Sequence, residues 1–396
     1  MSAHSPTLWL IVAPPLAGFF WQLAREIGKA PRSGSVVGSR RVGAGSVVLA
    51  SSATFGHAVR LAREPVGTGA LVQSAAASVD VGPLALHLGL RFDPISGAVS
   101  GLACAAAMAI AAWLASRKAD ERGGRVWAWL ELSLAGSLLS FLADDMVTAV
   151  AGWTLVAAAA AWLEGWTDPR RGAVRATRGA LAVLALLVGA ACHVETVAPP
   201  ALGPLAFLVA VGAMSASTLP AGAPLSLAAL GCGATIGLVG PFLLLRLSTL
   251  APMTATPEPM VAIAGVAMLV AIGRRALLEP PGPWRWLALV SGAPAGLTCI
   301  SFSSDGENGG VFVLLSAGMV ATWLLLAAAA RGLLVDRPAT PVRRDLEAVL
   351  LGRAPEAAGL LLLSFERWVV DAIGGAIVVL AHASGWALSR IDGRRL

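Results

Sequence analysis

Long apolar runs recur along almost the whole chain and constrain its fold more than any other feature. Two adjacent runs, 126–143 and 146–166, are separated only by the acidic turn Asp144-Asp145. A helix needs roughly 20 apolar residues to cross a bilayer, and each run is close to that length. The pair therefore predicts a transmembrane hairpin whose two aspartates lie at the water surface.

The composition favours a polytopic membrane protein over a soluble domain with a single anchor. Of the 396 residues, 57% are hydrophobic and 13% are charged, whereas soluble domains carry about 25% charged residues. About twelve runs have the length of a spanning helix, roughly 17–25 residues. We predict an all-α polytopic fold, with spans near 7–23, 43–62, 92–115, 126–143, 146–166, 178–194, 202–219, 224–247, 259–277, 284–302, 310–333 and 367–389.

Charged residues between the runs predict the topology. Basic residues follow the first, third, fifth, ninth and eleventh runs, whereas most intervening loops are acidic. By the positive-inside rule, the basic loops face the cytoplasm and the N-terminus lies outside. The modest net charge of +6 fits this pattern and gives no reason to expect nucleic-acid binding. We expect an integral protein of a bacterial-type inner (plasma) membrane.

The segment 338–359 differs from the rest of the chain. Charged residues alternate there with leucine and valine at helical spacing, as in Arg344-Asp345-Leu346-Glu347. This pattern predicts a short amphipathic helix in the membrane interface, with an ordinary polar loop as the alternative. We therefore expect a transmembrane domain at 1–337, this interfacial segment, and a C-terminal transmembrane helix within 360–396.

Several short motifs follow one another in a characteristic order. The segment 88–96 carries Asp93 and Ser96, and 142–145 is followed seven residues later by Gly152-Trp153. The segments 212–220 and 248–253 come further on. In order and spacing, these motifs resemble the antiporter-like subunits of respiratory complex I, above all its large L subunit. Those subunits are related to Mrp-type cation/proton antiporters.

The resemblance implies a membrane-arm subunit of a proton-translocating NADH-quinone oxidoreductase, packed beside other antiporter-like membrane subunits. It also shows which relay residues are replaced. Thr154 stands where the family has a glutamate in its fifth helix, and Ser215 where it has a lysine in its seventh. Neither hydroxyl titrates in the usable range. The chain also looks shorter than the L subunit, and we expect it to lack a proton channel of the family type.

Other polar residues in or near the apolar runs are candidates for a proton relay or for polar contacts in the membrane. Glu131 and Glu164 lie in the hairpin runs, where burial of a carboxylate costs at least a few kcal/mol. Anchoring at the interface is the simpler interpretation of both. Asp144 and Asp145 are expected to be solvated turn or capping residues, and Arg178 and Arg246 are expected to snorkel to the interface.

The sequence offers no motif for a redox cofactor or a metal. Its four cysteines are scattered singly, without the paired spacing of zinc or iron–sulfur sites. We therefore expect a structural or accessory, non-catalytic subunit without cofactors, in contact with lipid and with other membrane subunits. Two alternatives stay open. One is a subunit of a Mrp-type cation/proton antiporter or of an inorganic-carbon uptake complex, and the other is a helical scaffold without ion function.

Overall fold

A computed structural model of the chain describes residues 2–27, 35–64, 69–81, 84–116, 123–167, 169–194 and 238–250, with short stretches between 209 and 318. All of these residues belong to the first of two compact units, 1–330 and 331–396. The predicted interfacial segment 338–359 and the C-terminal helix within 360–396 lie outside the described residues, and so do the predicted span 202–219 (apart from residue 209) and Ser215.

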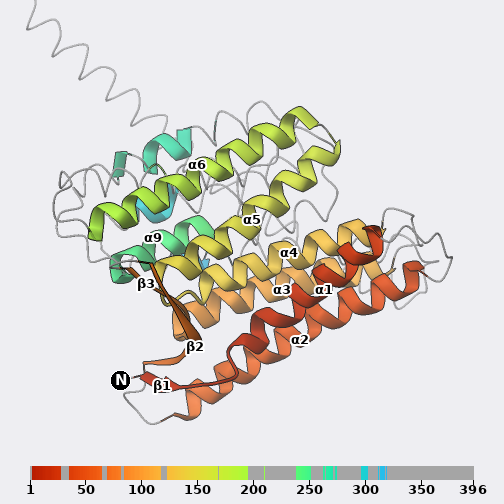
Figure 1. Cartoon of the computed structure of the whole chain (residues 1–396), viewed down its shortest axis with the longest axis horizontal. Helices are drawn as coiled ribbons and strands as arrows, with labels where there is room; N and C mark the ends of the chain where they lie inside the picture. The colour runs from red at the N-terminus through yellow and green to blue at the C-terminus, as the bar shows by residue number, and fades with distance from the viewer. Residues whose placement is uncertain are drawn as a thin grey trace, which may run out of the picture. The chain divides into compact units, whose positions relative to one another are not determined.

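The described part is a bundle of long helices with a small sheet at one end (Figure 1). The helices are α1 (Trp9–Ile27), α2 (Ser35–Arg63), α3 (Pro94–Ser116), α4 (Gly123–Phe141), α5 (Met146–Thr167), α6 (Pro169–Val194) and α9 (Val239–Leu250). The first six predicted spans each fall on one of the helices α1 to α6. Two stretches, Gly38–Arg63 and Pro94–Ala112, are both long and apolar enough to cross a membrane. The total of twelve spans stays a prediction.

The fold is mostly helical, as predicted, but a small sheet departs from the all-α prediction. Strands β1 (Ser2–His4), β2 (Ala70–Val81) and β3 (Leu84–Phe92) form it in that order. β1 runs parallel to β2, and β2 runs antiparallel to β3. The apolar residues of β3 occupy every second position from 84 to 92, which is the period of a strand with one buried face. The alternation from 84 to 92 is a local strand signal, and only its second half falls within the motif 88–96.

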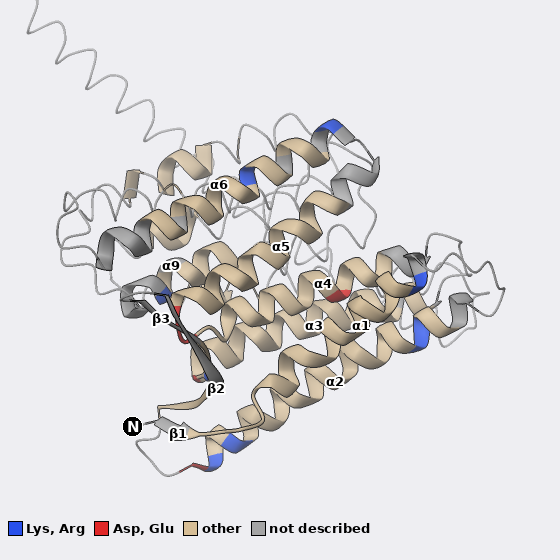
Figure 2. Cartoon of the chain, viewed as in Figure 1, with Lys and Arg blue, Asp and Glu red and all other residues tan. Residues whose placement is uncertain are grey.

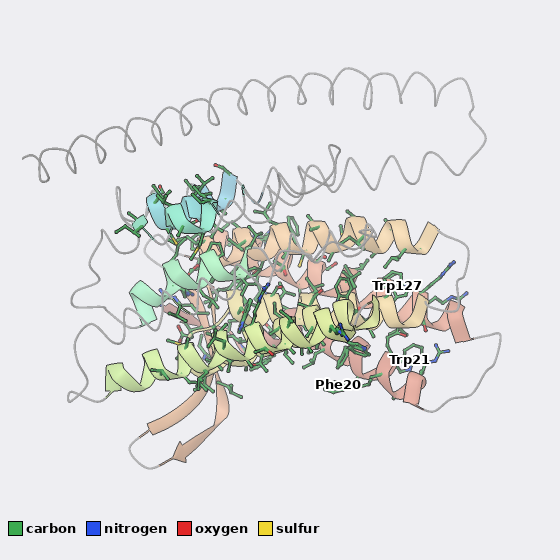
Figure 3. All side chains as sticks on the ribbon, turned by 90° about the horizontal axis from the view of Figure 1, so that it is seen from above. Phe20, Trp21 and Trp127 are labelled. Atoms are coloured by element: carbon green, nitrogen blue, oxygen red, sulfur yellow. The ribbon has the colours of Figure 1, made fainter. Side chains whose placement is uncertain are left out.

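Helix α4 is at the centre of the bundle. It packs against α1, α2, α3, α5 and α9, and all residues from 127 to 143 are buried. Trp127, near its start, is 2% exposed, whereas Phe20 of α1 is 56% exposed (Figure 3). Large apolar side chains also face outward on α2 and α6, among them Phe55 and Leu184. An apolar outer surface of this kind suits contact with lipid or with other membrane helices.

Charged residues of the described part lie mostly near the helix ends, and long central stretches are uncharged (Figure 2). We call the end that carries β1, β2 and β3 the sheet end. The opposite end, where α1 ends and α2 begins, is the far end. Arg25, Arg40 and Arg41 lie at the far end. The predicted topology would place this end at the cytoplasmic surface.

Two glycines let α4 and α5 approach closely. A Cβ atom on Gly152 of α5 would lie 2.6 Å from the backbone nitrogen of Ser140 and 2.9 Å from the carbonyl oxygen of Gly136. A Cβ atom on Gly136 of α4 would lie 2.8 Å from the carbonyl oxygen of Gly152. Small residues at the crossing are a common device of helix packing in membranes, and here they hold the predicted hairpin together.

Candidate functional site

Asp93 caps the N-terminus of α3 at the sheet end. Its Oδ1 accepts a hydrogen bond from the backbone N–H of Ser96 at 2.8 Å, and the Ser96 hydroxyl accepts one from the backbone N–H of Asp93 at 2.8 Å. This reciprocal pair has the pattern of a capping box, and Pro94 occupies the first helical position, where its fixed φ suits a helix. The local sequence therefore fixes the orientation of the Asp93 carboxylate.

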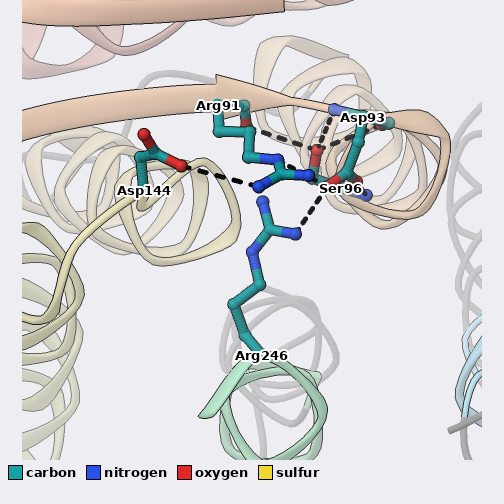
Figure 4. A network of polar contacts seen from close by, with 5 residues as sticks. All are labelled: Arg91, Asp93, Ser96, Asp144 and Arg246. Atoms are coloured by element: carbon teal, nitrogen blue, oxygen red, sulfur yellow. Dashed lines mark hydrogen bonds and ion pairs between the residues drawn. The ribbon is translucent and has the colours of Figure 1, made fainter. Parts of the chain in front are cut away.

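The other oxygen of Asp93 joins a network of charges that is buried at Asp93 and Arg246 and partly exposed at Arg91 and Asp144 (Figure 4). Its Oδ2 lies 2.5 Å from Nη1 of Arg246, and both side chains are less than 10% exposed. Nε of Arg91 lies 3.5 Å from the same oxygen, and Nη1 of Arg91 lies 3.9 Å from Oδ1 of Asp144. The prediction that Arg246 snorkels to the interface is wrong, because Asp93 provides a countercharge inside the fold.

The surroundings of Asp93 keep it ionised. The residue precedes the candidate span Pro94–Ala112. Burial alone would raise the pKa of Asp93, but the charge of Arg246 and hydrogen bonds from Ser96 and Arg246 hold it below its ordinary value. A lowered pKa stabilises the fold fully above the unfolded value of about 3.9, and this contribution is lost only as the pH falls through the folded pKa. The network should therefore persist at neutral pH.

The acidic turn between α4 and α5 is tied to β3 and is only partly solvated. The backbone N–H of Asp144 donates to the carbonyl oxygen of Gly89 at 3.0 Å, and the N–H of Gly89 donates to Oδ2 of Asp145 at 2.6 Å. Oδ1 of Asp145 accepts a hydrogen bond from the N–H of Thr148 at 2.8 Å, which caps α5. Capping is thus carried by Asp145, while Asp144 pairs with Arg91.

Replacing Asp145 with alanine is expected to lower the free energy of unfolding by about 1–2 kcal/mol, because α5 loses its cap and the Gly89 amide keeps only the Thr148 hydroxyl as an acceptor. Asparagine at this position can still cap α5 and should cost less. Thermal denaturation in mild detergent would measure both changes. Equal losses for Asp145→Ala and Asp145→Asn would show that the carboxylate acts by charge and not by capping.

Glu131 lies far from the interface position that the sequence predicts. It is 0% exposed in the middle part of α4, and its Oε1 accepts a hydrogen bond from the hydroxyl of Ser46 in α2 at 2.7 Å. Its carboxylate lies directly against Gly18 of α1, so that a Cβ atom there would overlap it. Because the helix continues for two turns on either side, Glu131 is enclosed by protein and cannot anchor the hairpin at a surface.

The other sequence candidates do not join these groups. Thr154 is exposed on α5, and its hydroxyl donates to the carbonyl oxygen of Val150 one turn earlier, at 2.8 Å. Arg178 is exposed on α6. The side chain of Glu164 lies outside the described residues. The structure therefore brings Asp144 and Arg246 into one network, through Arg91 and Asp93, and leaves Glu131 at a separate buried position.

The sequence analysis missed the structural role of Arg91, Asp93 and Ser96. Asp93 and Ser96 entered it only as part of a motif, although Asp-Pro-x-Ser at the start of an apolar run is a helix-start signal. The contact between Asp93 and Arg246 spans 153 positions of the chain. No local pattern could have paired them.

Comparisons with known proteins bear on the fold as a whole. No protein-family model and no curated protein matches the chain. Among solved structures it is similar to a chain of the membrane-bound sulfane sulfur reductase, an archaeal respiratory membrane complex, with a TM-score of 0.62 and 18% identity over 84% of this chain. It is also similar to a chain of the Mrp complex from Dietzia sp. DQ12-45-1b, with a TM-score of 0.59 and 16% identity over 85% of this chain.

The chain has the fold of antiporter-like membrane subunits. The similarity confirms the resemblance that the sequence motifs predict, and it covers most of the chain. The chain spans 57% of the length of the reductase subunit and 38% of the length of the Mrp subunit. Both comparison chains belong to integral membrane complexes with several subunits.

Proposed function

We propose that the chain is a membrane-arm subunit of a complex I-like, proton-translocating oxidoreductase, in which it has a structural or accessory role. The proposal includes about twelve spans of roughly 20 residues, a bacterial-type inner membrane and cytoplasmic basic loops. The antiporter-like fold supports membership of such an assembly. Apolar side chains that face outward on α2 and α6 are available for lipid and for neighbouring subunits.

The accessory role is supported above all by the exposure and the hydrogen bonding of Thr154. The resemblance implies that antiporter-like subunits have a glutamate at this position, which acts together with a lysine. Here the side chain is exposed, and its hydroxyl is bonded to the helix's own backbone. A threonine hydroxyl can pass on a hydrogen bond, but it cannot store a charge. The step in which a carboxylate shifts the protonation of a buried lysine is therefore not available at this position.

Replacement of Thr154 by valine is expected to leave assembly and proton translocation of the complex unchanged. The substitution removes the hydroxyl and keeps the branched shape of the side chain. It therefore tests only whether protons pass through this hydroxyl. Proton uptake by membrane vesicles during turnover would measure the effect. A loss of more than about tenfold, equivalent to about 1.4 kcal/mol, would assign Thr154 a role in proton transfer and would contradict the accessory role.

The purified chain in lipid vesicles should likewise show no proton flux above that of empty vesicles. A flux that Glu131→Gln or Glu164→Gln abolishes would contradict the proposal. Such a result would indicate a channel that uses different carboxylates from those of the family.

A second candidate function is that of a subunit in a Mrp-type cation/proton antiporter. The similarity to a chain of the Mrp complex from Dietzia sp. DQ12-45-1b supports it, and an inorganic-carbon uptake complex belongs to the same class. A transporter subunit needs titratable groups near the middle of the bilayer. Glu131 is such a group, but Thr154 is not. The subunits that accompany the chain in its native membrane would separate the two candidates.

A further inference from the structure

Glu131 has a buried carboxylate of which only one oxygen is satisfied. Oε1 accepts the hydrogen bond from Ser46, whereas Oε2 is buried and has no hydrogen-bond partner among the described residues. Gly18 leaves room for the carboxylate on the side of α1. An ionised carboxylate without a countercharge is very costly in an apolar interior, and such a group becomes neutral by taking up a proton.

The described charges near Glu131 do not compensate it. Charged residues and histidine on α4 and on the helices packed against it are Arg25, Glu26, Arg40, Arg41, His57, Arg60, Arg63, Arg125, Glu164 and Arg246. Those with described side chains form no ion pair with Glu131. Arg246 pairs with Asp93 at the sheet end, and Arg25 donates to the hydroxyl of Ser39 at the far end.

Buried polar groups lie between Glu131 and the far end of the bundle. Gln22 of α1 is one turn beyond Gly18 on the same face, about 6 Å along the helix axis. Its amide nitrogen donates to the carbonyl oxygen of Ser39 in α2 at 2.9 Å. The hydroxyl of Ser39 in turn accepts a hydrogen bond from Nη1 of Arg25 at 3.1 Å. Gln22 and Ser39 are buried, and Arg25 is partly exposed, so this polar path reaches the surface at the far end.

The side of Glu131 that faces the sheet end is apolar. Leu134 and Leu138 continue the Glu131 face of α4 in that direction, and Ile11 of α1 and Ala50 of α2 belong to the same hydrophobic core, each 0% exposed. On α2, the next buried polar side chain after Ser46 in this direction is Thr54. It lies eight residues further, which is about 12 Å along a helix. The buried serines of α4 in this direction, Ser133, Ser137 and Ser140, lie on the opposite face of the helix from Glu131, and Ser133 and Ser140 donate to backbone carbonyl oxygens of α4. On the Glu131 face, within the described part of the chain, the hydrogen-bonded polar side chains therefore lie toward the far end.

We propose that Glu131 is a proton-binding site that exchanges its proton with the far end of the bundle, along Ser46, Gln22 and Ser39, and not with the sheet end. This proposal does not depend on the complex to which the chain belongs. A site that binds and releases its proton on the same side of the membrane produces no net proton flux. It is therefore compatible with an accessory subunit, in which proton occupancy of Glu131 adjusts the contacts of α1, α2 and α4.

The site can be tested with dicyclohexylcarbodiimide, an apolar reagent that adds to protonated carboxyl groups. The O–H bond of the acid adds across one C=N bond of the carbodiimide, and the adduct rearranges to a stable N-acylurea without loss of any group. The full-length chain, with the subunits that purify with it, would be placed in sealed vesicles in one orientation. The pH would be set separately on the two sides, and mass spectrometry of peptides would measure the initial rate of labelling.

We expect labelling of Glu131 to follow the pH on the far-end side. Its rate should fall on the order of tenfold for each pH unit above the midpoint of its titration, and it should not respond to the pH on the sheet-end side. Labelling at this position should be absent from Glu131→Gln. The double variant Gln22→Leu, Ser39→Ala should slow the response to a pH jump at the far end, whereas Thr54→Val, on the sheet-end side, should leave it unchanged.

Two results would overturn the proposal. Absence of labelling at any pH in a folded, correctly inserted chain would show that Glu131 stays ionised with a partner. Labelling that follows the pH on the sheet-end side would reverse the direction of access. Neither result depends on which subunits co-purify, so failure of this site and failure of the proposed function can be told apart.

Discussion

Replacement of Asp93 by alanine is expected to lower the free energy of unfolding by about 3–5 kcal/mol, because it leaves the buried guanidinium of Arg246 without its countercharge. The Arg246 and Asp93 side chains are 8% and 9% exposed, so water cannot replace the lost partner. The same substitution removes the N-cap of α3, which adds about 1 kcal/mol. Chemical denaturation in mild detergent would measure the loss.

Two further variants separate the ion pair from the cap. The double variant Asp93→Ala, Arg246→Met removes both charges and should recover a large part of the loss, since a buried pair can be replaced by apolar residues at little cost. Asp144→Ala removes a partly exposed pair at 3.9 Å from Arg91, and should cost less than about 1 kcal/mol. A double variant as unstable as Asp93→Ala alone would contradict the importance of the pair.

Replacement of Gly152 by alanine is expected to lower the free energy of unfolding by about 1–3 kcal/mol, because the added methyl group forces α4 and α5 apart. The new Cβ atom would lie 2.5 Å from the Ser140 hydroxyl and 2.6 Å from the backbone nitrogen of the same residue. A backbone atom cannot move aside as a flexible side chain can, so the whole helix must shift. The midpoint of thermal denaturation in mild detergent would measure the effect.

Gly101 of α3 is the matched control for Gly152. A Cβ atom there would meet no atom within 4 Å among the described residues. Gly101→Ala should therefore be neutral, or stabilising by up to about 1 kcal/mol through helix propensity. If both substitutions had the same effect, the helix crossing would not depend on the two glycines.

The positions of the helices could be predicted from the sequence, because the length of an apolar run is a property of one segment. The central hairpin and the helices before it fall where the runs lie. The sheet could also have been predicted from the alternation in 84–92, but a short strand beside long apolar runs gives a weaker signal than the runs themselves. Asp-Pro-x-Ser at 93–96 is also a local signal, because it predicts the start of α3.

The polar interactions of the site could not be predicted, because each depends on segments far apart in the chain. Asp93 meets Arg246 across 153 positions, and Glu131 meets Ser46 across 85. A single sequence shows that a charged residue lies in an apolar run, but it does not show which face of the helix that residue occupies. For this reason, the sequence analysis placed Glu131 and Arg246 at the interface, and the structure buries both.

We propose that this chain is a membrane subunit of a complex I-like oxidoreductase. The most direct measurement is purification of a tagged copy from its native membrane in mild detergent, with mass spectrometry of the proteins that accompany it. We expect hydrophilic redox subunits together with other antiporter-like membrane subunits. Recovery of the chain alone, or with antiporter subunits and no redox subunit, would contradict it and would favour a transporter.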